Sequence, residues 1–183
     1  MFQRVTSRSP RTSSLRTRVA VLAAGAGATA ALGTGVASAA APSAASWVHP
    51  VKSYELSASF MQAGGHWVAR HSGQDFAVPT GTEVVAAHGG TVVKAGADGA
   101  GDGPAYGNAV VISHGDGTYS QYAHLSRIDV KAGQIVKTGQ RVARSGSSGN
   151  STGPHLHFEI RKNPDHGSAV DPVAFLRGKG VTV

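Results

Sequence analysis

Short apolar runs separated by turn-forming residues dominate the chain from about residue 47 onward. The runs are rich in β-branched side chains and are bounded by glycine, proline, asparagine and aspartate, which is typical of β-strands. We expect strands at residues 56–60, 75–78, 83–86, 90–94, 109–114, 118–124, 141–145 and 155–160. The pattern contains no heptads and no long amphipathic helix. It predicts an all-β protein with one short C-terminal helical turn at residues 170–176, where Asp171-Pro172 is a helix start signal.

Turns and loops divide these expected strands. His114-Gly115-Asp116-Gly117 predicts a hairpin turn, because Asp-Gly accepts the positive φ that such turns need. Two glycine-rich loops lie at residues 96–107 and 145–153. The second loop runs directly into an expected strand at His155, so we expect the loops to shape a groove beside that strand. The alternative is that both loops are plain surface linkers.

The N-terminal 39 residues have the order of a secretory signal peptide. A basic segment without acidic residues is followed by an Ala/Gly/Val/Leu stretch and by Ala37-Ser38-Ala39, a small-residue cleavage site. A membrane anchor and an organelle transit peptide are the alternatives, but the apolar stretch is poor in large residues. We therefore expect residues 1–39 to be the signal peptide and residues 40–52 to be a flexible N-terminal segment. The mature protein would be secreted, with no stable membrane association after cleavage.

Composition narrows the possible chemistry. The chain has no cysteine, so disulfides and thiolate metal sites are excluded. Five of the 17 basic residues precede the expected cleavage site, which leaves 12 against 10 acidic residues and a mature net charge of about +2. Nucleic acid is therefore not an expected partner. Any transition metal must be held by histidine and carboxylate, and a monomer is the default assembly.

The strongest candidate segment is His155-Leu156-His157-Phe158-Glu159-Ile160. Side chains alternate between the two faces of a strand, so both histidines face one way and the apolar residues face a core. Two imidazoles on one rigid face are suited to converge on a metal ion. The alternative is a pair of surface histidines on an exposed sheet.

Two further segments add to this candidate. His71 is expected in a loop and Asp75 at the start of the next strand, so that with another histidine they would supply three ligands and leave a fourth position for water or substrate. His124, in Tyr122-Ala123-His124-Leu125, ends an expected strand. A histidine there is a candidate general acid or base because its ordinary pKa is near neutral pH.

In combination, these segments resemble the lysostaphin-like (LytM-domain) zinc metalloendopeptidases of bacterial cell walls, over about residues 53–176. The resemblance rests on H-x-x-x-D, then Y-A-H-L, then a Gly/Ser loop leading to G-P-H-L-H-F-E. It implies an antiparallel sandwich-like core with an open groove and loops around a metal site, in a peptidoglycan metalloendopeptidase domain at residues 53–178. It also implies Zn²⁺ held by His71, Asp75 and His157, with His124 and His155 as catalytic histidines. The implied substrate is a peptide bond in peptidoglycan stem peptides or cross-bridges.

Several alternatives and secondary expectations remain. A catalytically silent wall-binding regulator would share the fold, although every position of the implied site is filled. A non-haem iron oxygenase is disfavoured because the sequence lacks the H-x-D spacing usual for that iron site. A biotin or lipoate carrier domain is disfavoured because the sequence has no lysine with the right neighbours at the required turn. We expect Glu159 to face along the sheet instead of contacting a ligand histidine. The other five histidines are expected to be surface or structural residues: His49, His66, His88, His114 and His166.

Overall fold

The computed structural model describes residues 46–65, 67 and 69–183. The expected signal peptide at residues 1–39 and the first part of the expected flexible segment lie outside these residues. Within the described part of the chain, the structure contains no helix of the length and apolar character needed to cross a bilayer.

The larger of two sheets has eight strands, and all of its strand pairs are antiparallel. Seven strands follow the order β1-β2-β10-β6-β5-β4-β8, and β11 pairs with β10. Their bounds are β1 Glu55–Leu56, β2 Gln74–Ala77, β4 Gly90–Gly96, β5 Asn108–Ser113, β6 Tyr119–Leu125, β8 Ile135–Val136, β10 His155–Arg161 and β11 Ala169–Val170. The order brings β2, β10 and β6 side by side, although they are far apart in the sequence.

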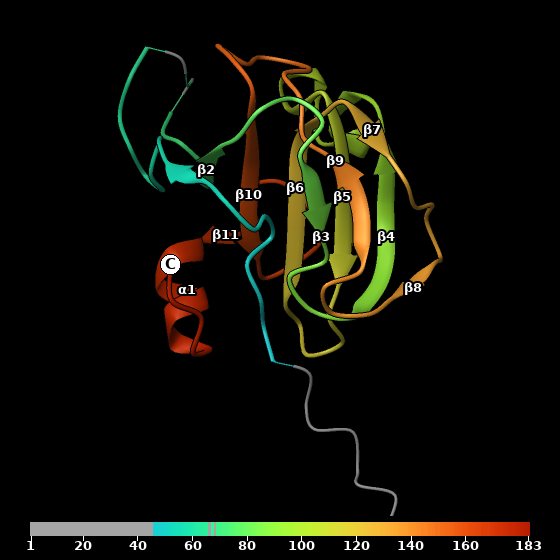
Figure 1. Cartoon of the computed structure of the whole chain (residues 1–183). Helices are drawn as coiled ribbons and strands as arrows, with labels where there is room; N and C mark the ends of the chain where they lie inside the picture. The colour runs from blue at the N-terminus through green and yellow to red at the C-terminus, as the bar shows by residue number, and fades with distance from the viewer. Residues whose placement is uncertain (1–45, 66, 68) are drawn as a thin grey trace, which may run out of the picture. The chain divides into compact units, whose positions relative to one another are not determined.

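The smaller sheet has three strands in the order β3-β9-β7 and covers one face of the larger sheet (Figure 1). Its strands are β3 Glu83–Val85, β9 Arg141–Arg144 and β7 Arg127–Ile128. Val84 and Val142 from this sheet share one fully buried core with residues of the larger sheet such as Tyr122, Phe158 and Ile160. Burying apolar surface between the two layers is the main favourable free energy that holds them together. The predicted all-β, antiparallel and sandwich-like fold is confirmed.

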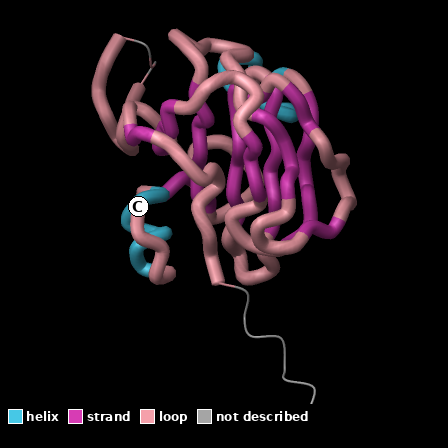
Figure 2. The backbone as a smooth tube through the Cα atoms, in the orientation of Figure 1, coloured by secondary structure: helices cyan, strands magenta, loops and turns pink. Residues whose placement is uncertain are grey.

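Strands and loops make up almost all of the described chain, and the only α-helix there is α1, Pro172–Gly178 (Figure 2). The side chain of Asp171 accepts hydrogen bonds from the backbone N–H groups of Val173 and Ala174, at 2.9 and 3.0 Å. This cap satisfies two amides that the first helical turn leaves without partners. Leu176 is fully buried and anchors the helix to the core. The helical turn predicted at residues 170–176 is thus present, with its start signal in use.

The expected strand at residues 56–60 is shorter in the structure and forms only β1. After Leu56 the chain still bonds to β2 through Ser57 N–H to Asp75 O, but a turn begins at Ser59, whose carbonyl accepts from Gln62 N–H. Three two-residue strands, β7, β8 and β11, were not predicted, because two residues carry no readable alternation. The loop at residues 96–107 contains two 3-10 turns, η1 Asp98–Gly101 and η2 Pro104–Tyr106.

The described end of the N-terminal segment packs into the core. Trp47 is 8% exposed and Val51 is fully buried. The Trp47 ring stacks on His88 with a centroid distance of 4.9 Å and meets Phe175 of α1 edge-on at 4.8 Å. The packed domain therefore begins N-terminal to residue 53, where we expected its boundary.

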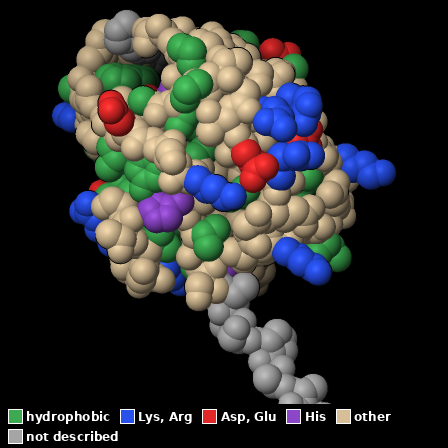
Figure 3. All heavy atoms as spheres, in the orientation of Figure 1, with side chains coloured by type: hydrophobic (Ala, Val, Ile, Leu, Met, Phe, Trp, Pro, Cys, Tyr) green, Lys and Arg blue, Asp and Glu red, His purple; other side chains and the backbone are tan. Residues whose placement is uncertain are grey.

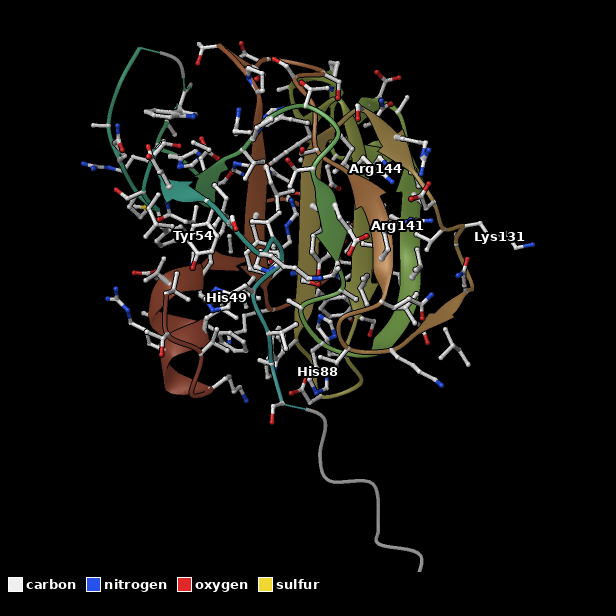
Figure 4. All side chains as sticks on the ribbon, in the orientation of Figure 1. His49, Tyr54, His88, Lys131, Arg141 and Arg144 are labelled. Carbon is white, nitrogen blue, oxygen red and sulfur yellow. The ribbon has the colours of Figure 1, made fainter. Side chains whose placement is uncertain are left out.

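Basic side chains gather on the outer face of the smaller sheet (Figure 3). Arg141 and Arg144 project from β9 in this region (Figure 4). The charge of this face is partly balanced, because Asp129 accepts from Arg127 Nε at 2.6 Å and from Arg141 Nε at 3.0 Å. Exposed ion pairs of this kind contribute little to stability, and none of the candidate chemical residues lies among them.

Candidate active site

Two adjacent strands position the first pair of candidate ligands. In the antiparallel pairing of β2 with β10, His157 lies directly opposite Asp75. The intervening residues Leu156 and Phe158 point into the apolar core, as strand alternation requires. The predicted face of β10 is therefore confirmed, and its second histidine faces a carboxylate on the neighbouring strand.

His71 joins this pair from the loop before β2. Its Nε2 lies 3.0 Å from His157 Nδ1 and 3.1 Å from Asp75 Oδ1, and the last two atoms are 2.9 Å apart. These three atoms form a nearly equilateral triangle. The side chains are almost fully buried and together form a group that could hold a metal ion.

Hydrogen bonds on the far side of each ring select the nitrogen that faces the triangle. His71 Nδ1 lies 2.9 Å from the carbonyl oxygen of Ser59, which only accepts, so this nitrogen carries the proton and Nε2 is free. His157 Nε2 lies 2.9 Å from Glu159 Oε1, so this nitrogen donates and Nδ1 faces the triangle. Such outer partners fix the tautomer and orientation of metal-binding histidines.

The electrostatics of the triangle favour an ionised Asp75 beside a protonated His157. Burial alone would raise the pKa of Asp75, but hydrogen bonds from His157 and His71 hold it well below its usual range. Burial would lower the pKa of His157, but the bonds to Asp75 and Glu159 raise it to about 9. Two imidazole nitrogens and one carboxylate oxygen are the donor set of many catalytic zinc sites, and ligands about 2.0–2.1 Å from zinc lie roughly 3.3 Å from each other. The residues present thus fit zinc.

His124 lies near the end of β6, beside the triangle. Its ring centroid is 4.6 Å from that of His155 and 5.7 Å from that of His157. Its Nδ1 donates to the carbonyl of Ser148 at 2.8 Å, which leaves Nε2 free to accept. Its φ of 58° is in the left-handed region, which few non-glycine residues adopt although histidine does so more often than most.

Burial, together with the nearby His157 and His155, lowers the pKa of His124 to about 4. Its imidazole is therefore neutral near pH 7. A neutral imidazole with one free nitrogen is suited to accept a proton.

His155 is the first residue of β10, and its side chain lies on the same face of the strand as that of His157. Its Nδ1 donates to the carbonyl oxygen of Gly153 at 2.8 Å, and its Nε2 lies 3.6 Å from Asp75 Oδ2. The Nε2 atom therefore lies next to the triangle formed by His71, Asp75 and His157. The structure brings together all five residues that the sequence singled out.

A groove of about 740 Å³ opens over these residues, a volume within the range of about 300–1,000 Å³ usual for ligand sites. Tyr106, from the loop at residues 96–107, lies on one side, and Gly153 and Pro154 come from the loop that precedes β10. The expectation that both glycine-rich loops shape a groove is confirmed.

Three residues of the site differ from expectation. Glu159 was expected to face along the sheet, but its carboxylate turns back toward His157 because His157 Nε2 and the Tyr106 hydroxyl both donate to it. Tyr106 was not singled out, although it is the only aromatic residue in its glycine-rich loop. His166 was expected to be a surface or structural residue, but its Nδ1 lies 2.7 Å from the Tyr106 hydroxyl and it lines the groove.

The remaining histidines that the structure describes lie outside the groove. His88 and His114 pack around Trp47 at the opposite end of β6 from His124. His49 Nδ1 lies 2.7 Å from the Tyr54 hydroxyl, and the two side chains lie side by side (Figure 4). His66 lies outside the described residues.

Comparison with known proteins identifies the family. The model of peptidase family M23 matches residues 69–172, which contain every residue of the triangle and both neighbouring histidines. The chain belongs to peptidase family M23. The expected resemblance to lysostaphin-like enzymes is therefore confirmed.

Three proteins illustrate what this M23 chain is similar to. It is 48% identical over 93 residues to the peptidoglycan DD-endopeptidase ShyA of Vibrio cholerae, covering 51% of this chain and 20% of that protein. Its structure matches the catalytic domain of the antimicrobial peptidase lysostaphin from Staphylococcus simulans, with a TM-score of 0.61 and 36% identity over 68% of this chain and 92% of that domain. It also matches a zinc-containing peptidase from Vibrio cholerae, with a TM-score of 0.59 and 34% identity over 69% of this chain and 39% of that one.

The matched region spans about a fifth of the length of ShyA. The similarity therefore covers the M23 domain and not the whole of that relative. In the lysostaphin comparison it covers nearly all of the catalytic domain.

Proposed function

We propose that this chain is a zinc-dependent endopeptidase that hydrolyses peptide bonds of peptidoglycan. The observation that carries the proposal is the convergence of His71, Asp75 and His157 beside two further histidines on the floor of one groove. The relatives support the substrate, because one is named a peptidoglycan DD-endopeptidase and another an antimicrobial peptidase.

In this proposal His71 Nε2, Asp75 Oδ1 and His157 Nδ1 hold the zinc ion. The chemistry that zinc supplies at such a site is Lewis-acid polarisation of a carbonyl group and of water. The protein contributes the orientation of its ligands, because each ring is fixed by a hydrogen bond on its far nitrogen. A solved relative described as zinc-containing supports the choice of metal.

His124 and His155 share the proton chemistry. One accepts the proton of the attacking water and passes it to the leaving amine, and the other, when it is protonated on both nitrogens, donates a hydrogen bond to the oxyanion that develops on the scissile carbonyl. Burial keeps His124 neutral, so its Nε2 carries a lone pair that faces the groove side of the site and can take the water proton. His155 Nε2 lies close enough to Asp75 for both rings to act on the same peptide bond. No covalent intermediate is required.

The proposal includes an extracellular or cell-wall location, which rests on the signal-peptide pattern of residues 1–39. The polypeptide would then act as a monomer on an insoluble substrate. Stem peptides and cross-bridges are both candidates for the bond that is cut.

The test is release of new amino groups from purified peptidoglycan by a protein beginning at Ala40. We expect release that a zinc chelator abolishes, that added zinc restores, and that His155→Ala lacks. Mass spectrometry of the fragments would then identify the bond. If zinc binds but several wall types release no amino groups, the chain is a wall-binding regulator and not an enzyme.

A further inference from the structure

We propose that Glu159 is a positioning residue for the metal site, holding the His157 imidazole so that Nδ1 faces His71 and Asp75. The inference rests on the proposed metal site and assigns a role to a residue outside it. Glu159 is fully buried and lies two positions after His157, on the same face of β10.

The contacts of the Glu159 carboxylate divide between its two oxygens. Oε1 accepts from His157 Nε2 and from the Tyr106 hydroxyl, both at 2.9 Å. Oε2 accepts from Arg161 Nε at 2.6 Å. The carboxylate is thus held from three sides, and its position relative to the His157 ring is fixed.

A second layer of buried contacts holds Arg161 in turn. Its guanidinium donates to Asp102 Oδ2 and, at 2.8 Å, to Gln121 Oε1. Gln121 lies opposite Glu159 in the pairing of β6 with β10, so neighbouring strands fix both ends of the network. Arg161 is fully buried, and every buried side-chain nitrogen and oxygen within the described residues has a partner.

This arrangement explains why a carboxylate can be buried beneath the site. Arg161 balances the charge of Glu159, while Oε1 stays available to the histidine. Without an acceptor at Nε2, the His157 ring would lose the bond that fixes its tautomer and its rotation. Loss of such an outer partner typically weakens metal binding by about 10- to 100-fold.

Two substitutions separate positioning from simple ion pairing with Arg161. Glu159→Leu removes the acceptor, whereas Glu159→Gln keeps one oxygen that can turn toward His157 and loses the negative charge. A positioning role predicts that the Gln variant keeps the zinc affinity that the Leu variant loses. A role limited to balancing Arg161 predicts that both variants behave alike. Asp102→Asn is the matched control, because it removes the other anion on Arg161 and leaves the His157 bond intact.

The measurement is zinc affinity in the mature protein, by competition with a chelator of known affinity and without any substrate. We expect roughly 10- to 100-fold weaker binding for Glu159→Leu, and values within about threefold of wild type for Glu159→Gln and Asp102→Asn. Equal losses in the Leu and Gln variants, or unchanged binding by the Leu variant, would overturn the proposal.

A measurement on the wild-type protein covers the case in which Glu159→Leu does not fold. Nitrogen-15 NMR of the zinc-loaded protein should show the His157 proton on Nε2, and a proton on Nδ1 would overturn the proposal. A wild-type protein that binds no zinc would overturn the metalloenzyme itself, whereas zinc binding that is independent of residue 159 overturns this inference alone.

Discussion

Gly73 lies against the His157 side chain so closely that a Cβ atom on residue 73 would be 2.9 Å from His157 Cε1. The same Cβ would be 2.9 Å from Glu159 Cγ and would overlap the backbone carbonyl of Phe158. The loop carrying His71 can approach β10 only because residue 73 has no side chain. This glycine sets the distance between the first and third candidate ligands.

Gly73→Ala is therefore expected to damage the site and the fold together. The added methyl must push the loop away from β10, which we expect to cost about 1–3 kcal/mol of stability and to weaken zinc binding. Denaturant unfolding and chelator competition measure the two effects. Gly178→Ala is the control, because a Cβ there meets nothing within 4 Å. Zinc affinity unchanged by Gly73→Ala would show that the loop tolerates the displacement.

Zinc should stabilise the folded protein, because the unfolded chain has no site at which to bind it. At free zinc about 100 times the dissociation constant, the expected gain is about 3 kcal/mol, seen as a higher Tm that a chelator reverses. His71→Ala should abolish this response. Magnesium is the control ion, because it prefers oxygen ligands. An equal rise in Tm with magnesium would contradict a selective histidine site.

The site residues that could be predicted from the sequence are those that lie in regular local structure. The positions of His155 and His157 follow from strand alternation, which has a fixed period, and His114-Gly115-Asp116-Gly117 formed the expected hairpin turn. The contact of Glu159 with His157 does not follow from alternation. It depends on a side chain bending back along its own strand.

The role of Tyr106 depended on the path of an irregular loop. Its hydroxyl meets Glu159 and His166, which lie 53 and 60 residues away in the sequence. Neither a period nor a short motif encodes such a meeting. The strand predicted at residues 56–60 was wrong after Leu56 for a similar reason. Apolar and polar residues continue to alternate there, but the chain turns at Ser59.

His124→Ala and His155→Ala should each reduce kcat/KM by about 10²- to 10⁴-fold, the usual contribution of a general acid or base. Both variants should still bind zinc, because neither side chain supplies a corner of the ligand triangle. The assay is hydrolysis of a purified peptidoglycan fragment, with zinc content measured on the same samples. His49→Ala, outside the groove, should retain activity. Loss of zinc from the His124 variant would instead make that residue a ligand.

The lowered pKa of His124 predicts how stability depends on pH. Its pKa is about 4 in the folded protein and near 6.5 when exposed, so between these values the unfolded chain binds more protons. The contribution is therefore fully present above pH 6.5 and is lost as the pH falls toward 4, up to about 3 kcal/mol.

Denaturant titrations of metal-free protein at pH 4.5, 5.5 and 7 would check this dependence. His124→Gln has no titrating ring, so its stability should change less across the range than that of wild type. Parallel curves for the two proteins would mean that the imidazole stays accessible to protons in the folded state.

The strand order of the larger sheet also determines when the chain acquires its chemistry. Asp75 and His157 meet across adjacent strands although 82 residues separate them in the sequence. Contacts of such long range form late and slowly, because the entropy of a large loop is lost before the contacts contribute favourable free energy. A chain still being synthesised has no assembled site for a metal ion, because β10 has not yet paired with β2. The topology therefore delays assembly of the proposed active site until the C-terminal third of the chain has folded onto the rest of the domain.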